Sequence, residues 1–333
     1  MKVGLIGAGR VGQKRAHHLV DTGTGELSLV SDAVPEREAQ IAETFGASIA
    51  YGWQEVVNNP EIDVVIVSAS NDLHAPVSIA ALESGKDVLC EKPLARTAAE
   101  SRTVWEAVNR TGQTLKTGFN HRHYGNVMRA KDLVDSDELG ELLWMRCRYG
   151  HSGSGAISHN PWFTDTSLSG GGTFLDNGVH ALDICRWFMG DFAEATGFVD
   201  TAHWHDISPV EDNGFGVFRT EKGRVATLHA SWTQWKNIFS VEIGLDKAIL
   251  EINGQEHLTI TLRENNDTYS IDREHFEVDY DESFKLDWLE FVAARNEGRP
   301  PLADARDGWK AVEMAEAVYE SSKNGRTIKL SDS

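Results

Sequence analysis

A glycine-rich run near the N-terminus constrains the fold more than any other feature of this sequence. The run, Gly7-Ala8-Gly9-Arg10-Val11-Gly12, follows a short apolar stretch and precedes a stretch with a helical pattern. A turn of this kind between a buried strand and a helix is typical of the first strand–helix unit of a doubly wound α/β domain. The run alone is weak evidence, because glycine-rich turns are common between strands and helices, so the surrounding chain has to supply the context.

The first 120 residues supply that context, because short apolar runs alternate there with helical patterns, as a parallel sheet with crossover helices requires. The runs are rich in β-branched residues and apolar at consecutive positions, as expected of strands buried on both faces. They are Val3–Ile6, Leu27–Val30, Val64–Val67 and Val88–Cys90. Proline or glycine marks the ends of the helical patterns, which are Pro35–Phe45, Ala75–Ser84 and Thr97–Thr111. We predict a doubly wound α/β domain over residues 1–120.

Residues 121–333 have a different pattern and are predicted to form a second, α+β domain. From about Phe192 to Tyr280 polar and apolar residues alternate, which predicts antiparallel hairpins and a sheet with one exposed or partner-covered face. The strand patterns include Arg224–Trp232, Phe239–Gly244, Ala248–Ile252 and His257–Leu262. Helices are expected at Asn126–Asp135, Thr173–Phe188, Phe284–Asn296 and Trp309–Lys323. A further strand is expected at Leu142–Tyr149, followed by a loop rich in Gly, Ser and His at Gly150–Gly172. Residues 264–282 hold eight acids and one base, which favours a solvated strand edge over a cation site.

The charge balance excludes some classes of partner. The chain of 333 residues carries 32 Lys and Arg against 51 Asp and Glu, a formal net charge of −19, which argues against a nucleic-acid backbone or an anionic membrane surface. The charge is uneven: residues 1–120 have 11 bases and 15 acids, and residues 121–333 have 21 and 36. The more acidic second part favours neutral over strongly anionic small molecules as ligands, although one arginine such as Arg122 could reverse this locally.

The cysteines and the apolar runs indicate in which cellular compartment the protein is expected. Cys90, Cys147 and Cys185 are an odd and sparse set without metal-ligand spacing, which favours a reducing compartment over a disulfide framework. No apolar run approaches the roughly 18 residues of a membrane span. The N-terminal apolar stretch is short and cut by glycines, unlike a signal peptide. We therefore expect a cytoplasmic protein.

If the ligand is a dinucleotide, each glycine of the glycine-rich run has its own role in forming the site. Gly7 makes the tight turn, Gly9 lets the backbone approach a pyrophosphate, Gly12 lets helix pack on strand, and the helix N-terminus offers free N–H donors to the anion. Asp32 ends the second strand pattern about 20 residues later, where an acid accepts hydrogen bonds from the ribose hydroxyls. Because this carboxylate would repel a 2′-phosphate, NAD is favoured over NADP.

Two alternatives accompany that interpretation. Asp32 could merely cap the turn that follows the strand. Arg37 could reach a 2′-phosphate, although its place within a helical pattern favours a surface position or stacking on adenine.

A lysine follows the fourth strand pattern of this domain. Cys90-Glu91-Lys92-Pro93 follows the strand residues Asp87–Leu89 and hence lies at the carboxyl edge of the sheet, where open α/β folds bind ligands. Lys92 could there hold a cationic donor against a substrate hydroxyl or developing alkoxide. The competing interpretation is an ordinary surface lysine in a loop. The Lys92–Pro93 peptide bond is predicted to be cis, because proline beside a catalytic residue can fix an unusual turn.

A second group of polar residues lies in the expected helix Thr173–Phe188. Three glycines, Gly170-Gly171-Gly172, precede it, and Asp176 and His180 are four residues apart, hence on one face and one turn apart. Histidine is the natural proton shuttle for alcohol oxidation, and a carboxylate one turn away can orient its ring and stabilise the cation. A lone histidine would more often be a core residue, but the glycines and the Asp-x-x-x-His spacing favour a functional one.

With these motifs in order, the sequence resembles the glucose–fructose oxidoreductase/inositol dehydrogenase/MocA family over nearly the whole chain. The matching strings are Gly7-Ala8-Gly9-Arg10-Val11-Gly12, Asn71-Asp72-Leu73-His74, Cys90-Glu91-Lys92-Pro93-Leu94-Ala95, Gly118-Phe119-Asn120, and Gly170-Gly171-Gly172 with Asp176 and His180. The resemblance implies a Rossmann domain followed by an α/β domain whose large open antiparallel sheet is often used for oligomer contacts. A homodimer or homotetramer built through the C-terminal sheet is therefore expected.

The resemblance also implies roles for single residues. Lys92, Asp176 and His180 would form the catalytic set, with His180 as general base and Lys92 binding the reacting oxygen. The residues expected to bind the cofactor are Gly7, Gly9, Arg10, Val11, Gly12, Asp32, Arg37, Asn71, His74, Glu91, Lys92 and Asn120. Those expected to bind substrate are Lys92, Arg122, Trp162, Asp176 and His180.

The chain departs from the family pattern in two places. Ala69-Ser70-Asn71 stands where the family often has Thr-Pro-Asn, which affects contacts near the nicotinamide. His121-Arg122-His123 stands where Arg-Arg or Arg-Phe often follows Gly-Phe-Asn, which affects the substrate class rather than the fold or the reaction.

We predict reversible hydride transfer between NAD and a secondary alcohol of a sugar, inositol or polyol derivative. Trp162 would suit the apolar face of a sugar ring, whereas Trp204, Trp232 and Trp235 are expected to pack in a core or an interface. Two alternatives stay open: an enzyme that uses NAD transiently for epimerisation, elimination or hydrolysis, and a non-catalytic NAD-binding sensor. A metal hydrolase, suggested by His121-x-His123 and His203-x-His205, is disfavoured because no third ligand has suitable spacing, and no metal is expected.

Overall fold

The computed structural model describes residues 1–153, 161–205, 209–279 and 281–331 of the chain. They form two compact units. The first unit comprises Met1–Asn120, Ser167–Gly170 and Tyr280–Val312, and the second comprises His121–Thr166, Gly171–Asp279 and Glu313–Ser333. Among the helices of the described residues, none is long and apolar enough to cross a membrane.

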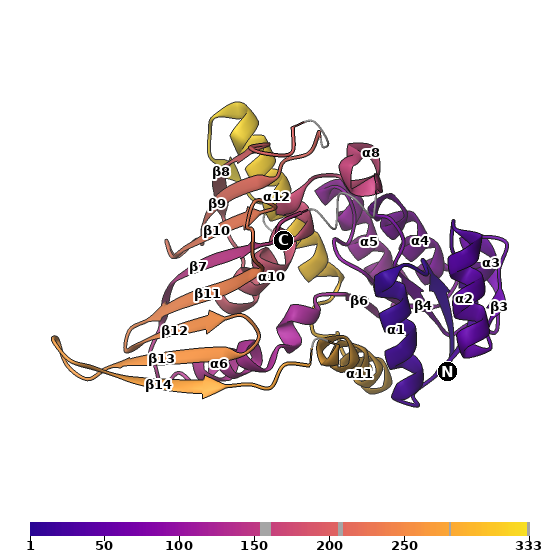
Figure 1. Ribbon diagram of the computed structural model, residues 1–333, viewed down its shortest axis with the longest axis horizontal. Helices are drawn as coiled ribbons and strands as arrows, with labels where there is room; N and C mark the ends of the chain where they lie inside the picture. Colours follow the sequence, from indigo (N-terminus) through magenta and orange to yellow (C-terminus); the bar gives the residue numbers. More distant parts are fainter. Residues whose placement is uncertain (154–160, 206–208, 280, 332–333) are drawn as a thin grey trace. The chain divides into compact units, whose positions relative to one another are not determined.

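The first unit contains a six-stranded sheet in the order β3-β2-β1-β4-β5-β6, in which every neighbouring pair is parallel (Figure 1). The strands are β1 (Lys2–Ile6), β2 (Glu26–Ser31), β3 (Ser48–Ile49), β4 (Val64–Val67), β5 (Asp87–Cys90) and β6 (Leu115–Thr117). The strand order reverses between β1 and β4, and in such sheets ligands bind at this point, beyond the carboxyl ends of the strands. The predicted doubly wound fold is confirmed.

Helices cover both faces of this sheet. On one face α3 (Trp53–Asn58), α4 (Asn71–Glu83) and α5 (Ala98–Thr111) pack in one apolar core, and on the other face α1 (Arg10–Asp21) and α2 (Pro35–Phe45) pack in a second. Glycines in the left-handed conformation end two of these helices, Gly46 after α2 and Gly112 after α5, as the sequence predicted. Helix α4 begins at Asn71 rather than at Ala75, so Asn71 and His74 lie in its first turn.

The second core also contains α11 (Glu282–Glu297), which lies far along the chain. Trp288 and Phe291 of α11 are almost fully buried beside α1, and Trp288 Nε1 donates to Thr24 Oγ1 at 2.7 Å. The prediction of one continuous domain over residues 121–333 therefore needs correction. The chain returns to the first unit at residues 280–312 because the apolar side of α11 completes the core on the α1 face of the sheet.

The second unit contains a nine-stranded sheet in the order β14-β13-β12-β11-β7-β10-β9-β8-β15. The strands are β7 (Leu142–Gly150), β8 (Glu194–Asp200), β9 (Asn213–Arg219), β10 (Val225–Ser231), β11 (Ile238–Leu245), β12 (Ala248–Asn253), β13 (His257–Arg263), β14 (Tyr269–His275) and β15 (Ile328–Lys329). All neighbours are antiparallel except β7 and β10, which are parallel. The sheet is therefore mixed rather than purely antiparallel, because β7 is inserted between strands that come later in the chain. The acidic segment near residue 270 forms the exposed edge strand β14, as predicted.

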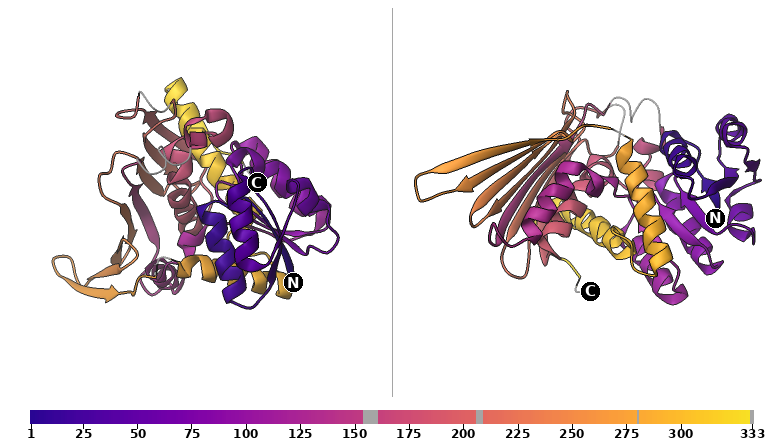
Figure 2. Two further views of the ribbon diagram at one scale, coloured as in Figure 1. Left: turned by 45° about the vertical axis from the view of Figure 1, so that its right-hand side comes forward. Right: turned by 90° about the horizontal axis from the view of Figure 1, so that it is seen from below.

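Helices pack on one face of this second sheet. Helices α9 (Thr173–Asp176) and α10 (Gly178–Met189) contact the consecutive strands β7, β10 and β9, and α6 (Gly125–Asp135) contacts β12 and β13. In the right panel of Figure 2 the other face carries no helix from the part of the chain that the structure describes. The remaining elements are two short 3₁₀ turns at Asn120–His123 and Pro161–Thr164, α8 (Thr166–Ser169) and α12 (Ala305–Asn324).

The helix predicted at Thr173–Phe188 is interrupted at Asn177. This residue keeps helical dihedral angles, φ −84° and ψ −44°, but the N–H of His180 donates to the carbonyl of Asn177 at 3.2 Å, three residues back rather than four. Asp176 therefore ends α9 and His180 lies in the first turn of α10, on a tightened stretch rather than on one regular helix.

Candidate active site

The glycine-rich loop joins β1 to α1 in the first unit. Gly7 has φ +95°, and a Cβ there would lie 2.3 Å from the carbonyl oxygen of Ser68. A Cβ on Gly12 would lie 2.0 Å from the carbonyl oxygen of Gly7, whereas a Cβ on Gly9 would meet nothing within 4 Å. The outer two glycines thus close the turn, and Gly9 at the N-cap of α1 leaves open space in front of the helix N-terminus, as a pyrophosphate requires.

Asp32 holds this loop against the end of β2. Its Oδ2 accepts from the N–H of Ala8 at 2.5 Å and its Oδ1 accepts from the N–H of Val34 at 2.8 Å. The second contact is the turn cap that the sequence left open as an alternative. The first contact is to the glycine-rich loop itself, so the structure brings Gly7–Gly12 and Asp32 together, as a dinucleotide site demands.

The other residues predicted to bind the cofactor fall into two groups. Arg10 and Val11 form the first turn of α1, and Arg37 is exposed in the first turn of α2. Two asparagines are instead buried and bound to neighbouring segments: Asn71 Nδ2 donates to the carbonyl of Ser169 and Asn120 Nδ2 to Ser283 Oγ, each at 2.8 Å. The side chains of this second group fix loops of the first unit.

Lys92 follows β5 at the carboxyl edge of the sheet, and its peptide bond to Pro93 is cis, as predicted. The neighbouring Glu91 is buried and accepts from Arg15 of α1, with Nε–Oε1 and Nη2–Oε1 distances of 2.7 and 2.6 Å. Glu91 was predicted to bind the cofactor, but its carboxylate anchors the loop that carries Lys92 to α1. Lys92 itself is half-buried.

His74 is a further support of the Lys92 loop. Its Nδ1 lies 2.7 Å from the carbonyl oxygen of Pro93, and its Nε2 lies 3.1 Å from that of Ala69. Burial lowers the pKa of His74 below its usual value, against the opposing effect of the Pro93 carbonyl. The imidazole thus bridges the loops after β4 and β5, a different role from the predicted contact with the cofactor.

A buried charge network that the sequence did not reveal lies beneath these loops. Arg15 Nη1 donates to Asp287 of α11 at 2.6 Å, and the fully buried Lys116 of β6 lies 3.2 Å from Asp287 and 2.6 Å from Glu290. Each of these buried charges has an opposite charge beside it, which its desolvation requires. The partners are more than 150 residues apart in the chain, so no local pattern could indicate them.

In the second unit the three-glycine run leads into α9. A Cβ on Gly172 would lie 2.0 Å from the backbone oxygen of Glu211, and one on Gly171 would lie 2.4 Å from Tyr319 Oη. The buried Glu211 carboxylate accepts from the N–H groups of Gly172 and Phe174 at 2.8 and 2.9 Å, and from Tyr319 Oη at 2.8 Å. Burial raises the pKa of Glu211 despite these donors. Glu211 therefore caps the helix turn that ends in Asp176, a role that the sequence did not indicate, because Glu211-Asp212 matches no motif.

His180 lies in a cluster of rings in the second unit. The ring of His121 stacks on it, with centroids 3.8 Å apart and an angle of 35° between the planes. His121 Nε2 lies 3.0 Å from Tyr149 Oη, and the Tyr149 ring centroid is 6.2 Å from that of His180. Burial, assisted by Tyr124 and the charge of Asp176, raises the pKa of Tyr149. His121 and Tyr149 were not among the predicted site residues.

Arg122, predicted to bind substrate, forms an ion pair in the second unit. Its Nε and Nη2 donate to the two carboxylate oxygens of Asp183 at 2.7 and 2.5 Å, and both side chains are buried. The guanidinium carbon lies 5.1 Å from the Trp187 ring centroid. A bidentate, desolvated pair of this kind fixes two segments to each other, here the turn before α6 and helix α10.

The tryptophans considered in the sequence differ in how deeply they are buried. Trp162 is half-buried and stacked on Phe163 with centroids 4.1 Å apart, and most of the loop that precedes it, residues 154–160, lies outside the described residues. Trp232 is fully buried with Trp204 packed against it, as expected of core residues. Trp235 is 67% exposed, so it does not pack in the core, and of the expected core or interface position only an interface stays a prediction for this residue.

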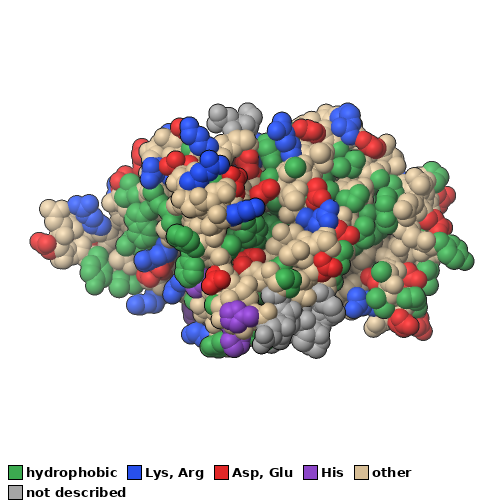
Figure 3. Space-filling model, turned by 90° about the horizontal axis from the view of Figure 1, so that it is seen from above, with side chains coloured by type: hydrophobic (Ala, Val, Ile, Leu, Met, Phe, Trp, Pro, Cys, Tyr) green, Lys and Arg blue, Asp and Glu red, His purple; other side chains and the backbone are tan. Residues whose placement is uncertain are grey.

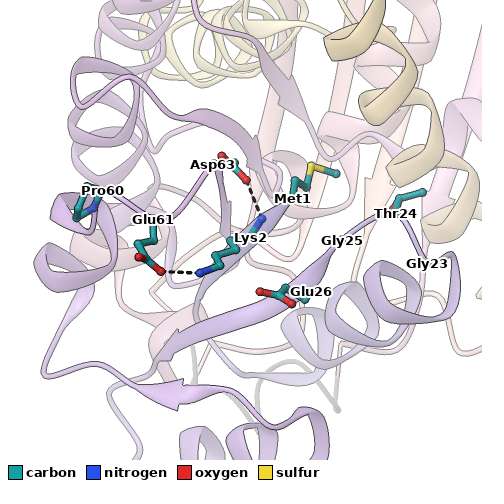
Figure 4. A pocket seen from close by; sticks show the side chains of 9 residues that line it. All are labelled: Met1, Lys2, Gly23, Thr24, Gly25, Glu26, Pro60, Glu61 and Asp63. Atoms are coloured by element: carbon teal, nitrogen blue, oxygen red, sulfur yellow. Dashed lines mark hydrogen bonds and ion pairs between the residues drawn. The ribbon is translucent and has the colours of Figure 1, made fainter.

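Figure 4 shows a hollow of about 770 Å³ in the first unit, lined by residues such as Lys2, Glu26, Glu61 and Asp63. It lies at the amino end of β1 and β2, the edge opposite to the glycine-rich loop, so it is not the dinucleotide site.

The described residues contain no group of three His, Cys, Asp or Glu side chains arranged for a metal ion. On the face shown in Figure 3, acidic, basic and hydrophobic side chains are interspersed.

Comparison with known proteins agrees with this architecture. A family model described as an oxidoreductase family with an NAD-binding Rossmann fold matches residues 1–119, and the GFO/IDH/MocA C-terminal domain matches residues 127–251. A solved structure of levoglucosan dehydrogenase in complex with NADH and L-sorbose superimposes with a TM-score of 0.93 at 24% identity and covers 100% of this chain and 99% of that one.

Three curated relatives act on sugars or inositol. Levoglucosan dehydrogenase of Pseudarthrobacter phenanthrenivorans is 31% identical over 67% of this chain and 59% of its own length. Myo-inositol 2-dehydrogenase of Thermotoga maritima is 27% identical over 100% of this chain and 99% of its own, and D-glucoside 3-dehydrogenase of Escherichia coli is 27% identical over 99% and 97%. The chain therefore belongs to the GFO/IDH/MocA family of oxidoreductases and has that family's NAD-binding Rossmann fold.

Proposed function

We propose that this protein is an NAD-dependent dehydrogenase that oxidises a secondary alcohol of a sugar, an inositol or a related polyol to the ketone. The observation that carries the proposal is that the family's glycine-rich loop, Lys92, Asp176 and His180 are all present in a chain whose relatives are named sugar and inositol dehydrogenases. The two alternatives, transient use of NAD and a sensor without catalysis, make different predictions in the assay below.

The cofactor fits the residues at the carboxyl edge of the first sheet. Gly9 leaves space in front of α1, whose first N–H groups, those of Arg10 and Val11, are placed to bind the pyrophosphate. Asp32 keeps lone pairs for the ribose hydroxyls while it holds Ala8 and Val34, and its charge disfavours a 2′-phosphate, so NAD is preferred to NADP. Bound NAD supplies the hydride acceptor.

The residues of the chain supply binding and proton transfer. We assign to Lys92 the binding of the reacting oxygen, whose negative charge grows as the proton leaves. His180 takes the hydroxyl proton while the carbon loses a hydride, and Asp176 stabilises the imidazolium that results. The products are the ketone, the reduced nicotinamide and one proton, so the reaction balances. Trp162 is assigned to the apolar face of the substrate ring.

The test is formation of NADH, followed by absorbance, with a panel of inositols, aldoses, glycosides and polyols. A dehydrogenase accumulates NADH with at least one of them, whereas an enzyme that re-reduces its intermediate does not, and a sensor binds NAD without turnover. The variant Lys92→Ala is expected to bind NAD normally and to lose about 10²-fold or more in kcat, the scale of one lost oxyanion contact. Lys222→Ala, an exposed lysine, is the matched control. Wild-type turnover by Lys92→Ala would overturn the mechanism.

We further propose a homodimer or homotetramer formed through the helix-free face of the nine-stranded sheet. Phe198, Phe215 and Val217 are 72%, 52% and 41% exposed on neighbouring strands β8 and β9, where a monomer would leave an apolar patch in water. The expected change for Phe198→Asp with Phe215→Asp is dissociation, seen as a lower mass by light scattering. Tyr51→Asp, at a fully exposed tyrosine of the first unit, is the control. A wild-type monomer would contradict the proposal.

A cytoplasmic location is proposed as well, since Cys90, Cys147 and Cys185 are all free thiols, as a reducing compartment maintains them. Cell fractionation with an antibody against the protein tests this, and recovery from an extracytoplasmic fraction would contradict it.

A further inference from the structure

His121 occupies a position beside His180 that the proposed mechanism has not used. It is 6% exposed and its ring lies 3.8 Å from the His180 ring, centroid to centroid. On its other side, Nε2 is 3.0 Å from Tyr149 Oη. Rings of Tyr124 and Phe239 also lie near it, at centroid distances of 4.5 and 5.4 Å. His121 is thus enclosed between the proposed general base and a buried phenol.

The segment that carries His121 is fixed to the helix that carries His180. Arg122, the next residue, forms its bidentate ion pair with Asp183, which is three residues beyond His180 on α10. Because both ends of the pair are buried, the turn at Asn120–His123 cannot slide along α10 without separating two desolvated charges. The stacking of the two imidazoles is therefore a constrained feature of the second unit rather than a chance contact.

The protonation of the group follows from its neighbours. Two phenols lie against His121, Tyr149 on β7 and Tyr124 before α6, and the charge of Asp176 at the end of α9 acts on Tyr149. Burial raises the pKa values of both Tyr149 and Tyr124, so both phenols keep their protons. A protonated Tyr149 can donate to His121 Nε2, and in that arrangement a neutral His121 carries its proton on Nδ1. Two imidazolium rings at 3.8 Å would repel each other, so a neutral His121 is the form that allows His180 to become charged.

We propose that His121 is a positioning residue for His180: Tyr149 donates a hydrogen bond to His121 Nε2, and the neutral His121 ring stacks on His180 and lets it accept the substrate proton. This inference rests on the proposed dehydrogenase function for its role in catalysis. The hydrogen bond and the coupling of the two histidines are properties of the protein without substrate. Tyr149 acts in this scheme only through His121.

The test is a double-mutant cycle in the full chain. Tyr149→Phe removes only the hydroxyl, His121→Phe keeps a stacked ring without the nitrogens, and the third variant combines both changes. Each single change is expected to lower kcat by about tenfold, part of the 10²–10⁴ that proton transfer contributes, with little change in the KM for NAD. The double variant is expected to equal His121→Phe, because the phenol has no further effect once Nε2 is gone. Tyr269→Phe, at an exposed tyrosine of β14, is the control.

A second readout does not depend on turnover. In protein labelled at histidine, the His180 resonance is assigned from the His180→Asn variant and followed by NMR against pH without substrate. Tyr149→Phe is expected to lower the pKa of His180 by about half a unit or more, because His121 then takes up a proton and repels a charge on His180. The same change in the His121→Phe background is expected to have no effect.

The outcomes separate the two proposals. Multiplicative losses in kcat, or equal shifts of the His180 resonance in both backgrounds, would overturn the role of His121. Unchanged kcat and an unchanged His180 titration in Tyr149→Phe would overturn it as well. If the NMR cycle shows the coupling but no substrate yields NADH, the dehydrogenase proposal fails and the assignment of the His121–Tyr149 pair stands. Circular dichroism of each variant verifies that it is folded.

Discussion

The ion pair between Arg122 and Asp183 gives a stability prediction whose size follows from the structure. Arg122 and Asp183 are 2% and 1% exposed and share two hydrogen bonds. Asp183→Asn keeps the shape but removes the carboxylate charge that the buried guanidinium contacts, and removal of one partner of such a pair costs about 3–5 kcal/mol. The Trp187 ring at 5.1 Å offers only partial compensation, of about 1–2 kcal/mol. We expect the variant to lose a large part of the stability of the second unit.

The assay is urea unfolding followed by both fluorescence and circular dichroism. With a urea slope of about 2–3 kcal/mol/M, the unfolding midpoint is expected to fall by about 1–2 M. Glu274→Gln is the matched control, because its pair with Arg129 is at the surface and is worth at most about 1 kcal/mol. The combined variant Arg122→Met with Asp183→Leu is expected to recover most of the loss, because apolar side chains of similar volume replace a buried pair at little cost.

Two results would refute this reasoning. If Asp183→Asn shifts the midpoint no more than Glu274→Gln does, the pair does not hold α10 to the turn before α6. If the combined variant is stable but its KM for the sugar rises by more than about tenfold while that for NAD is unchanged, Arg122 binds substrate after all, as the sequence predicted.

Three further predictions concern other parts of the site. Gly172→Ala, whose Cβ would lie 2.0 Å from the Glu211 backbone oxygen, is expected to destabilise the protein by about 1–3 kcal/mol and to impair NADH formation, and an unchanged unfolding midpoint would contradict this. Glu91→Gln is expected to cost about 1–3 kcal/mol, because the buried Arg15 keeps only the carboxylate of Asp287, and a urea midpoint equal to the wild type would count against it. For His74, burial lowers the folded-state pKa below 6.5, so the unfolded chain binds a proton that the folded protein excludes, and stability is lost as the pH falls through that value. Between about pH 7 and 5, His74→Gln is expected to reduce the slope of the unfolding free energy against pH by at most about 1.4 kcal/mol per pH unit. A slope identical to that of the wild type would contradict this.

The sequence predicted the first unit well because its signals are local. Each strand of that sheet is a short apolar run, and the glycine-rich loop, Asp32 and Lys92 each follow a strand directly, so their place at the carboxyl edge follows from chain order alone. The three-glycine run and Asp176 were likewise recognisable by spacing. What these signals could not provide were the contacts between loops, such as those of His74 with the Pro93 carbonyl and of Glu91 with Arg15.

The remaining features depend on contacts between distant segments. Lys116 and Asp287 are in ion-pair contact across 171 residues of chain, and the parallel pairing of β7 with β10 joins segments about 80 residues apart. Neither leaves a periodic pattern in the sequence. Glu211 lies beside a second acid, Asp212, and Tyr149 lies in strand β7, and neither position belongs to a recognisable motif. His121 had one signal, the departure of His121-Arg122-His123 from the family pattern, and of these three residues only Arg122 was predicted to be a site residue.

The negative net charge of the chain says less about its ligands than the sequence alone suggested. Inside the units the described buried acids have local partners: Glu91 and Asp287 face Arg15, Asp183 faces Arg122, and Glu211 faces N–H groups and a phenol. The surplus acids lie where water screens them, as on the exposed edge strand β14. Net charge therefore describes the surface, and any preference for neutral substrates has to come from the groups that line the binding site. If His180 takes up the substrate proton as proposed, the charge of the neighbouring His121 ring acts on it directly, and we propose that the hydrogen bond between His121 and Tyr149 sets that charge.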